Sequence, residues 1–282
     1  MRRRRLLLGL TFAPLAGLAP AGGARPRALA EDLTRRDLAH GGAAVLADAR
    51  AATAEVLTRG TRGDDAAAIL DRTAWALRDA GAATPVERRG LLSTAERLAD
   101  DSWLRTHIRL DRALTFDDAD DPAGAVRELM TVLAGPVPPV QRAGLHAAAA
   151  RCAERAGDTG AAVTHLEAAE RLHGHGRVDV PAWAVPVLGD AGQLPGAIGR
   201  GWLAVGRCRR AEEWLTLADE AYGPGRGRGR ASGLVRRAHA RLALGDLGGC
   251  DADLAAAGGM DVTSAQLDAG LRRVRRLREV RR

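Results

Sequence analysis

The sequence predicts an all-α protein in which antiparallel helical hairpins stack as an α-solenoid. Strong helix formers, chiefly Ala, Leu, Arg and Glu, dominate the composition. Aromatic residues make up only 3% of the 282 residues, and no segment of the body shows the alternating pattern of a strand. A third observation is a spacing of Gly, small residues and Leu that recurs along the chain. With 46% hydrophobic residues, the chain has enough apolar surface for a folded core.

Residues 1–30 have the pattern of a leader. Arg2–Arg5 precede an apolar run, Leu6–Leu15, and Ala28–Ala30 supply an A-x-A cleavage pattern before Glu31. Consecutive arginines followed by leucines resemble a twin-arginine export signal. A basic linker that follows a separately encoded upstream domain explains the same residues, and both interpretations stay open. The apolar run is too short for a stable membrane span, so none is expected.

Residues 31–135 are expected to form helical hairpins. Thr84-Pro85-Val86-Glu87 is a complete helix start signal, because Thr caps the helix, Pro suits its first position and Glu reaches back to the cap. Asp121-Pro122 starts a later helix in the same way, and Gly135–Pro139 is a firm break. The predicted helices are Asp37–Arg59 as one long Ala-rich helix, Asp64 to Gly81, Pro85 to Leu98, Trp103 to Phe116, and Pro122 to Leu133.

Residues 136–262 contain the recurring pattern in three clear copies. In each copy a Gly ends one helix, a small residue follows five positions later, a Leu four after that, and an Ala three later again. Gly permits a tight turn, and small residues let two antiparallel helices approach closely. A weaker fourth copy begins at Asp121. The clear copies are Gly157, Ala162, Leu166 and Ala169; Gly206, Ala211, Leu215 and Ala218; and Gly245, Cys250, Leu254 and Ala257.

These residues resemble the tetratricopeptide repeat (TPR), and the clear match covers residues 140–260. The motif has an aromatic residue near the end of its first helix, which Phe116 and Trp202 supply and the other copies lack. The resemblance implies a non-enzymatic scaffold whose stacked hairpins form a concave surface for a protein or peptide. The small residues that the motif places in its first helix are present at Ala150, Gly199 and Ala238.

A second resemblance is to the repeat halves of actinobacterial Xre-type helix-turn-helix regulators. It rests on Leu234–Leu247, on the Arg-rich segment Leu271–Leu277 and on an arginine-leucine leader. The resemblance implies a regulatory or sensor module of a GC-rich actinobacterium, and the absence of Lys and Asn fits a GC-rich genome. Residues 1–30 have no room for a helix-turn-helix, so direct DNA binding is not expected. Residues 263–282 are predicted to form an Arg-rich C-terminal helix capped by Thr263-Ser264.

Charge and missing residue types exclude several classes of function. All 42 basic residues are Arg, so a phosphate-loop lysine and a Schiff-base lysine are absent. The net charge is +7, and residues 1–30 and 271–282 contribute +6 each, which leaves −5 for the body and argues against a basic DNA groove. The three cysteines lie far apart and form neither a disulfide scaffold nor a zinc pattern. No catalytic set, metal site or cofactor is expected.

Residues on the first helices of the repeats are expected to face the concave surface and to bind the partner. Arg151 and Arg155 lie one turn apart and are expected to hold a carboxylate of a partner, such as an acidic side chain or a C-terminus. The alternative is that they are ordinary solvent-facing arginines. The expected partner is a protein or peptide with an acidic segment, and the sequence does not predict an oligomeric state. The full set is Arg151, Arg155, Arg200 and His239, with His107 from the weaker copy.

Two further segments are expected to lie outside the hairpins. Residues 173–196 are rich in Gly and Pro and are predicted to be an insertion, and Gly223–Arg230 is predicted to be a flexible loop. The acidic cluster before the break at residue 122 is predicted to be solvated and to cap helices rather than to bind a cation. Its members are Asp117, Asp118, Asp120 and Asp121.

Overall fold

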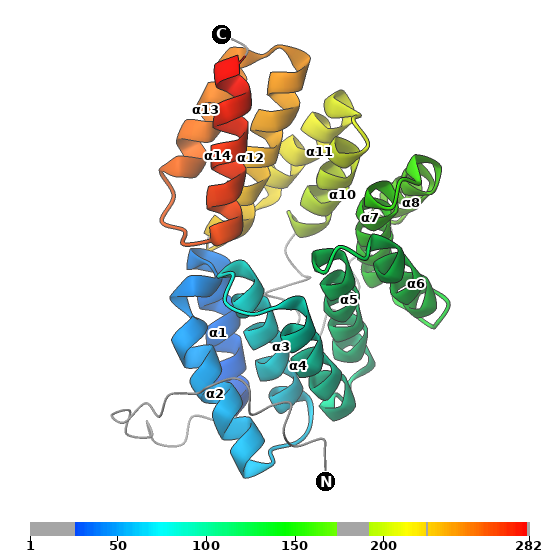
Figure 1. Cartoon of the computed structure of the whole chain (residues 1–282), viewed down its shortest axis with the longest axis vertical. Helices are drawn as coiled ribbons and strands as arrows, with labels where there is room; N and C mark the ends of the chain where they lie inside the picture. The colour runs from blue at the N-terminus through cyan, green and yellow to red at the C-terminus, as the bar shows by residue number, and fades with distance from the viewer. Residues whose placement is uncertain (1–25, 174–191, 224, 281–282) are drawn as a thin grey trace.

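The computed structural model describes residues 26–173, 192–223 and 225–280, and within these ranges every regular element is helical (Figure 1). The all-α prediction is confirmed. The α-helices are α1 Pro26–His40, α2 Leu46–Arg59, α3 Asp64–Asp79, α4 Pro85–Leu98, α5 Ser102–Asp118, α6 Pro122–Leu133, α7 Pro139–Arg155, α8 Thr159–His173, α10 Gln193–Ala204, α11 Cys208–Ala221, α12 Gly227–Leu244, α13 Leu247–Gly258 and α14 Ala265–Val280, with a short 3-10 helix η1 at Gly42–Ala44.

The helices pair as antiparallel hairpins that stack in chain order, as predicted. The pairs are α3 with α4, α5 with α6, α7 with α8, α10 with α11 and α12 with α13. The first helices of successive hairpins also pack against one another, from α3 through α5, α7 and α10 to α12. We call these helices, together with α1, the inner helices, because they form one continuous side of the stack.

The predicted repeat corresponds to the turn and the packed face of each hairpin. Gly157, Gly206 and Gly245 each have a positive φ, at 85°, 74° and 85°, which turns the chain from the first helix into the second. The small residues, the leucines and the alanines that follow in all three copies are buried. The spacing therefore indicates both where each hairpin bends and which residues fill it.

The weaker fourth copy follows the same geometry with a different residue at the turn. Asp120 has a φ of 62° and stands five positions before the buried Ala125, where the other copies have Gly. Asp tolerates this left-handed conformation better than most residues. Asp121 then caps α6 by accepting a hydrogen bond of 2.8 Å from the amide of Gly124.

Gly199 shows why a small residue is needed in a first helix. A Cβ added at this position of α10 would lie 2.7 Å from Cγ of Leu215 on α11 and 3.1 Å from its backbone nitrogen. The missing side chain therefore sets the close approach of the two helices. Ala150 and Ala238, the corresponding residues of α7 and α12, are also fully buried.

The long helix predicted over residues 37–59 is wrong, because the chain breaks between α1 and α2. Gly41 has a φ of 93°, which an α-helix does not accept. Gly42 packs on α3 so closely that a Cβ would lie 2.8 Å from the carbonyl oxygen of Ala76. The contact between Gly42 and α3 therefore fixes the break between α1 and α2, although the Ala-rich sequence on both sides favours a helix.

The predicted loop at residues 223–230 is also partly wrong, because α12 begins at Gly227. Arg228 pairs with Asp37 of α1 and Arg230 pairs with Asp219 of α11. Gly227 lies against α1, where a Cβ would be 2.6 Å from the carbonyl oxygen of Ala39. Two of the glycines that suggested flexibility, Gly227 and Gly229, therefore serve close packing.

Two predicted helix starts are confirmed in detail. Thr84 and Glu87 form a reciprocal capping box at the start of α4. Ser264 accepts a hydrogen bond from the amide of Leu267 at the start of α14. Of the expected leader, residues 1–25 lie outside the described ranges, whereas its last residues belong to α1, where Ala30 is buried. The predicted insertion at 173–196 lies mostly outside them as well, and the domain boundaries stay predictions.

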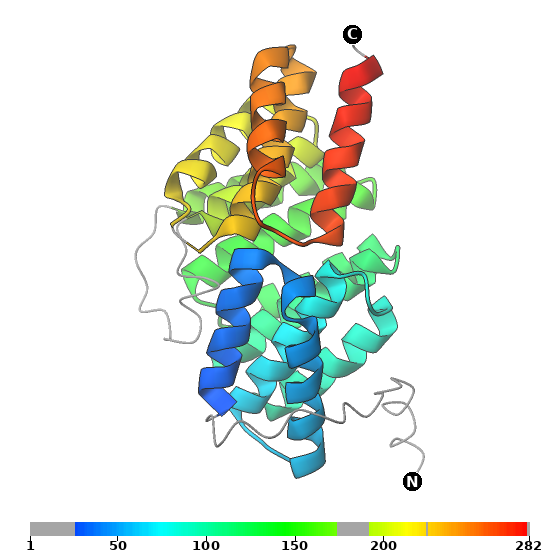
Figure 2. The same cartoon turned by 90° about the vertical axis from the view of Figure 1, so that its left-hand side faces the viewer.

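The beginning and the end of the stack touch, with α1 directly beside the start of α12 and the loop before α14 (Figure 2). The amide of Thr263 donates to the carbonyl oxygen of His40 over 2.7 Å. Asp79 at the end of α3 accepts from the amide of Gly42 over 2.7 Å and from the hydroxyl of Ser264 over 2.6 Å. The inner helices therefore surround a common interior. No helix in the described ranges is both long and apolar enough to cross a bilayer.

Candidate binding surface on the inner helices

A groove of about 170 Å³ runs along the interior face between α3, α5, α7 and α10. Its apolar wall includes Leu110 and Leu114 of α5. Val140, Gly144 and Ala148 form a stripe on α7, because residues four apart share one face of a helix. We call this space the inner groove. Its position agrees with the concave surface that the repeat pattern predicts.

Trp75 of α3 stands at one end of the inner groove, between two arginines. The guanidinium carbon of Arg78 lies 5.1 Å from its ring centroid and that of Arg228 lies 5.2 Å away. The indole is half-buried, and its Nε1 has no hydrogen-bond partner among the described residues. Nε1 is itself buried, so the half-exposed part of the ring is what Trp75 presents to the groove.

Arg151 and Arg155 do hold one carboxylate, as their spacing predicts, but it belongs to this chain. Asp117 of α5 is 1% exposed and lies 3.1 Å from Nη2 of Arg151 and 2.6 Å from Nη1 of Arg155. Arg155 also reaches Asp120 over 3.1 Å. Binding of a partner carboxylate by this arginine pair stays a prediction, and the structure gives the pair a role in joining α5 to α7.

Asp118 binds two arginines on the other side of α5. It accepts hydrogen bonds of 2.7 Å from Arg78 of α3 and from Arg88 of α4. Burial acts to raise the pKa of Asp118, but the hydrogen bonds and charges of Arg78 and Arg88 outweigh it and lower the pKa below its ordinary value. The prediction of a solvated cluster is wrong for Asp117 and Asp118, which are paired, and right for the helix cap at Asp121.

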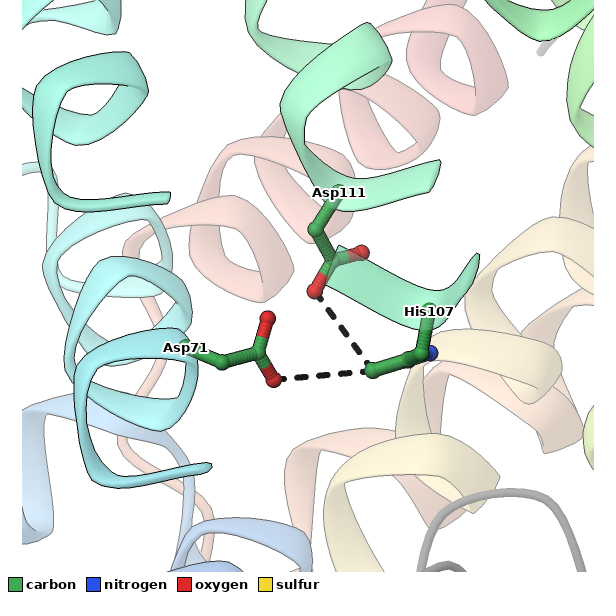
Figure 3. Close-up of side chains that lie close together, drawn as sticks. All are labelled: Asp71, His107 and Asp111. Carbon is green, nitrogen blue, oxygen red and sulfur yellow. Dashed lines mark ion pairs between the residues drawn. The ribbon is translucent and has the colours of Figure 1, made fainter. Parts of the chain in front are cut away.

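His107 lies apart from the arginine pairs, in a buried cluster with Asp71 and Asp111 (Figure 3). Arg72 is buried in the same cluster. Its Nε2 is 3.6 Å from Asp71 and 3.7 Å from Asp111, a spacing that a metal ion can bridge. Nη2 of Arg72 occupies the same place, 2.6 Å from Asp71 and 2.9 Å from Nε2 of His107. The guanidinium therefore supplies the positive charge that the two carboxylates require.

The pKa values in this cluster follow from burial and from the paired charges. Burial opposes the charge of Arg72, but the carboxylates of Asp71 and Asp111 outweigh it and raise the pKa of Arg72. Burial raises the pKa of Asp111. The cluster faces the inner groove through Arg72, His107 and Asp111. It forms part of the wall of the groove and joins α3 to α5.

Arg200 of α10 lines the inner groove on the side of Trp75 and Arg228, since all three residues also line the cavity beside it. Burial lowers the pKa of Arg200 well below its ordinary value, and the positive charges of Arg151 and Arg236 lower it further. Arg236 of α12 has its pKa lowered to about 10, first by burial and then by neighbouring arginines, with Tyr222 acting in the opposite direction. Both side chains are half-buried and lie in a strongly positive environment.

No known family model and no curated protein matches the chain. Solved structures of similar fold include the nearly identical TPR-like repeats of a Podosopora anserina kinesin light chain, at 16% identity and a TM-score of 0.41 over 73% of this chain and 93% of that one. BtubC (BKLC) from P. vanneervenii is similar at 12% identity and a TM-score of 0.46, over 89% of this chain and 93% of that one. The repeat geometry itself makes the chain a TPR-like stack of helical hairpins.

The five predicted partner-binding residues of this TPR-like stack thus fall into separate places. Arg200 and His107 line the inner groove, and Arg151 and Arg155 bind Asp117 beside it. His239 of α12 is half-buried, and it is not among the residues that line the groove within the described ranges. Its role stays a prediction.

Sequence reasoning missed four residues of the interior face. Trp75, Arg78, Arg228 and Arg236 line the inner groove or the cavity beside it. A helical-face plot of α12 would place Arg228 and Arg236 near one stripe, because they are eight residues apart. No local sequence pattern indicates that α3 lies opposite these two arginines.

Proposed function

We propose that the chain is a non-enzymatic TPR-like scaffold that binds an extended or helical segment of a protein partner in the inner groove. One observation carries the proposal: a groove with an apolar wall on α5 and α7 ends at Arg200, which no carboxylate of the described residues neutralises. Apolar walls with a few placed polar groups are typical of binding sites.

The groove favours a partner segment that combines apolar and acidic side chains. Leu110, Leu114 and Ala148 offer apolar contact, and Arg200 and Arg228 stand at the end of the same space. A carboxylate beside Arg200 gains a charge-assisted hydrogen bond and relieves the repulsion among the arginines. The proposed partner is therefore acidic, as the sequence predicts, but its carboxylate is expected to bind Arg200 rather than Arg151 and Arg155.

The proposal includes a regulatory or sensor role, with export as the alternative. A chain that leaves the cytoplasm loses its leader, and cleavage after Ala30 removes the first turn of α1, on which Ala30 is buried. An exported chain with α1 intact therefore begins no later than Pro26. Mass spectrometry of the native protein from cytosolic and extracytoplasmic fractions measures this directly.

Glycines on the two sides of the stack provide a matched pair of variants for the groove. Gly144 lines the groove on α7 and Gly90 is exposed on α4, and an added Cβ meets nothing within 4 Å at either position. Gly144→Glu therefore adds bulk and negative charge on the groove wall, with open space around its Cβ. Gly90→Glu adds the same side chain on an outer helix.

The test is a selection of binders from a random peptide display library with the wild-type chain. Selected peptides are expected to carry acidic and apolar residues, to bind Gly90→Glu like the wild type, and to bind Gly144→Glu at least about tenfold more weakly. Circular dichroism checks that both variants keep their helicity. Equal binding to both variants, or no selected peptide, contradicts the proposal.

A further inference from the structure

A second cavity of about 140 Å³ lies beside the inner groove, between α3, α10 and α12. Arg78, Arg200, Arg228 and Arg236 all line it, and we call it the arginine cavity. Arg200 and Arg228 also line the inner groove, so the two spaces are neighbours. Four guanidiniums from three helices around one small space are unusual, because like charges repel and burial costs each of them hydration.

Among the described residues, two of the four guanidiniums have a carboxylate partner. Arg78 binds Asp118 over 2.7 Å, and Arg228 binds Asp37 over 3.0 Å. Within the described ranges, neither Arg200 nor Arg236 has an ion pair with an Asp or Glu, and none is among the main influences on their pKa values. The pKa of each is lowered, which is the direction expected for a cation that lacks an anion.

Asp79 also lines the arginine cavity, but both of its carboxylate oxygens already accept hydrogen bonds from elsewhere in the chain. Its two carboxylate oxygens accept hydrogen bonds from the amide of Gly42 and the hydroxyl of Ser264, which hold the two ends of the stack together. It therefore contributes one negative charge to the wall against four positive ones, and Arg200 and Arg236 keep an excess of positive charge.

Tyr222 brings a hydroxyl to the same wall through a slot made by glycines. A Cβ at Gly192 would lie 2.7 Å from the Tyr222 ring, one at Gly229 would lie 2.9 Å from it, and one at Gly196 would lie 3.1 Å from its hydroxyl. Only glycines on α12 and at the start of α10 leave room for this ring. Gln193, Ser232 and Gln266 add neutral hydrogen-bonding groups around the cavity.

We propose that the arginine cavity binds a phosphate dianion, held by Arg200 and Arg236 with Arg78 and Arg228 behind them. Two uncompensated guanidiniums match the two negative charges of a phosphate monoester, whereas one carboxylate neutralises only one of them. Guanidinium forks bind phosphate oxygens in pairs, so arginines from α10 and α12 can each take two. The cavity is also several times the ~30 Å³ that a water molecule occupies, so a phosphate group fits.

This inference goes beyond the proposed peptide groove and does not depend on it. The phosphate can belong to a free small molecule, or to a phosphorylated side chain of the partner that continues from the groove into the cavity. Both sources share the same chemistry at Arg200 and Arg236. The experiment below separates them.

The test is isothermal titration calorimetry of the full chain with inorganic phosphate, phenyl phosphate and acetate. We expect both phosphates to bind and acetate to bind at least about tenfold more weakly. Arg200→Gln and Arg236→Gln are each expected to lower phosphate affinity at least about tenfold. The control Arg272→Gln/Arg273→Gln removes two exposed charges of α14 and is expected to leave the affinity unchanged. No binding by the wild type, or equal binding by cavity and control variants, overturns the proposal.

A measurement on the wild type keeps the proposal falsifiable if the variants fold poorly. Phenyl phosphate gains its second negative charge near pH 6, so its affinity is expected to rise at least about threefold between pH 5 and 7.5. Sulfate has two negative charges throughout this range, so any change in its affinity with pH comes from the protein. The ratio of phenyl phosphate affinity to sulfate affinity therefore reports the protonation of phenyl phosphate alone. A ratio that does not change with pH contradicts binding of the dianion.

The source of the phosphate follows from two further titrations. If a phosphoserine version of a peptide selected for the groove binds at least tenfold tighter than both its unphosphorylated form and phenyl phosphate, the partner supplies the phosphate. If phenyl phosphate binds as tightly as the phosphopeptide, the ligand is a free phosphate ester. Phosphate binding without any selected peptide refutes the groove alone, and peptide binding without phosphate binding refutes the cavity alone.

Discussion

The guanidinium of Arg228, on α12, lies 3.0 Å from the carboxylate of Asp37, on α1, across 191 positions of the chain. This pair joins the first helix of the stack to its last hairpin. It also places Arg228 beside Trp75, where the inner groove and the arginine cavity meet. The same contact therefore closes the stack and shapes the binding surface.

Arg228→Met is expected to lower the free energy of unfolding by about 3 kcal/mol, because it leaves Asp37 buried without its cation. Urea denaturation measures this. The control is Arg35→Met, which removes an exposed arginine of α1, the helix that carries Asp37. It is expected to change the free energy of unfolding by less than about 0.5 kcal/mol. The double variant Asp37→Leu/Arg228→Met is expected to recover most of the loss, and a double variant as unstable as the single one contradicts this role.

The loss in Arg228→Met is expected to depend on pH. Burial raises the pKa of Asp37, and Arg228 opposes it, so the variant has a still higher folded-state pKa. A folded-state pKa above the unfolded one means that the folded chain holds the proton more tightly. The deficit is therefore expected to be smallest near pH 4 and to grow as the pH rises through the folded-state pKa. A deficit that does not vary with pH contradicts this.

Arg151→Met is expected to destabilise the chain by about 1–2 kcal/mol, because the almost fully buried Asp117 loses one of its two arginines but keeps the hydrogen bond from Arg155. Arg155→Met removes the hydrogen bonds to the carboxylate and the backbone oxygen of Asp117 and is expected to cost more, about 2–3 kcal/mol. Thermal denaturation of both variants checks the order. If neither variant loses stability, the pair is not structural, and binding of a partner carboxylate by both arginines is again the favoured role.

Gly199→Ala is expected to lower the free energy of unfolding by about 1–3 kcal/mol, because the new methyl group meets Leu215. Gly90→Ala is the matched control, since both glycines lie within helices and Gly90 has open space around it. Helix propensity alone is expected to make the control more stable by about 0.5–1 kcal/mol. Chemical denaturation of the two variants is expected to give shifts of opposite sign.

The contact between His146 and His165 is expected to lower the free energy of unfolding in mild acid. Their Nδ1 atoms lie 3.0 Å apart, which requires one neutral ring to accept. Burial, with the charge of His165 next, lowers the pKa of His146 to about 4, and burial lowers that of His165. The unfolded chain therefore takes up these protons first, and stability is expected to fall between pH 6.5 and 4.

The double variant His146→Gln/His165→Gln tests this by its pH profile. Its free energy of unfolding is expected to fall less steeply than that of the wild type between pH 6.5 and 4. His40→Gln removes an exposed histidine at the end of α1 and is expected to keep the wild-type slope. Parallel profiles for the double variant and the wild type exclude the histidine pair as a source of acid sensitivity.

The hairpins could be predicted because their signals are local. Gly157, Gly206 and Gly245 mark turns through a backbone conformation, and the small residues and leucines after them lie within about three helical turns. The capping box at Thr84 is equally short in sequence. Each of these features is decided by residues within about twelve positions, so one sequence suffices to identify it.

The binding surface could be predicted only in part, because its charges pair over long distances. Arg151 and Arg155 were placed on the correct helix, but their partner, Asp117, lies on the preceding hairpin. The meeting of α1 with α12 had no sequence signal, so the surroundings of Arg236 could not be foreseen. The break at Gly41 and the helical start at Gly227 share this cause, since a contact with a distant helix fixes each of them.

Binding of the partner in the inner groove can be followed through the 19F NMR signal of Trp75 in the 5-fluorotryptophan-labelled chain. Trp75 lies in the groove, whereas Trp202 and Trp214 both donate to Glu170 in the packing of α8, α10 and α11. Trp75→Phe assigns the groove signal. We predict that a selected peptide shifts the Trp75 signal and leaves the signals of Trp202 and Trp214 in place. A bound peptide that leaves Trp75 unchanged would contradict the account.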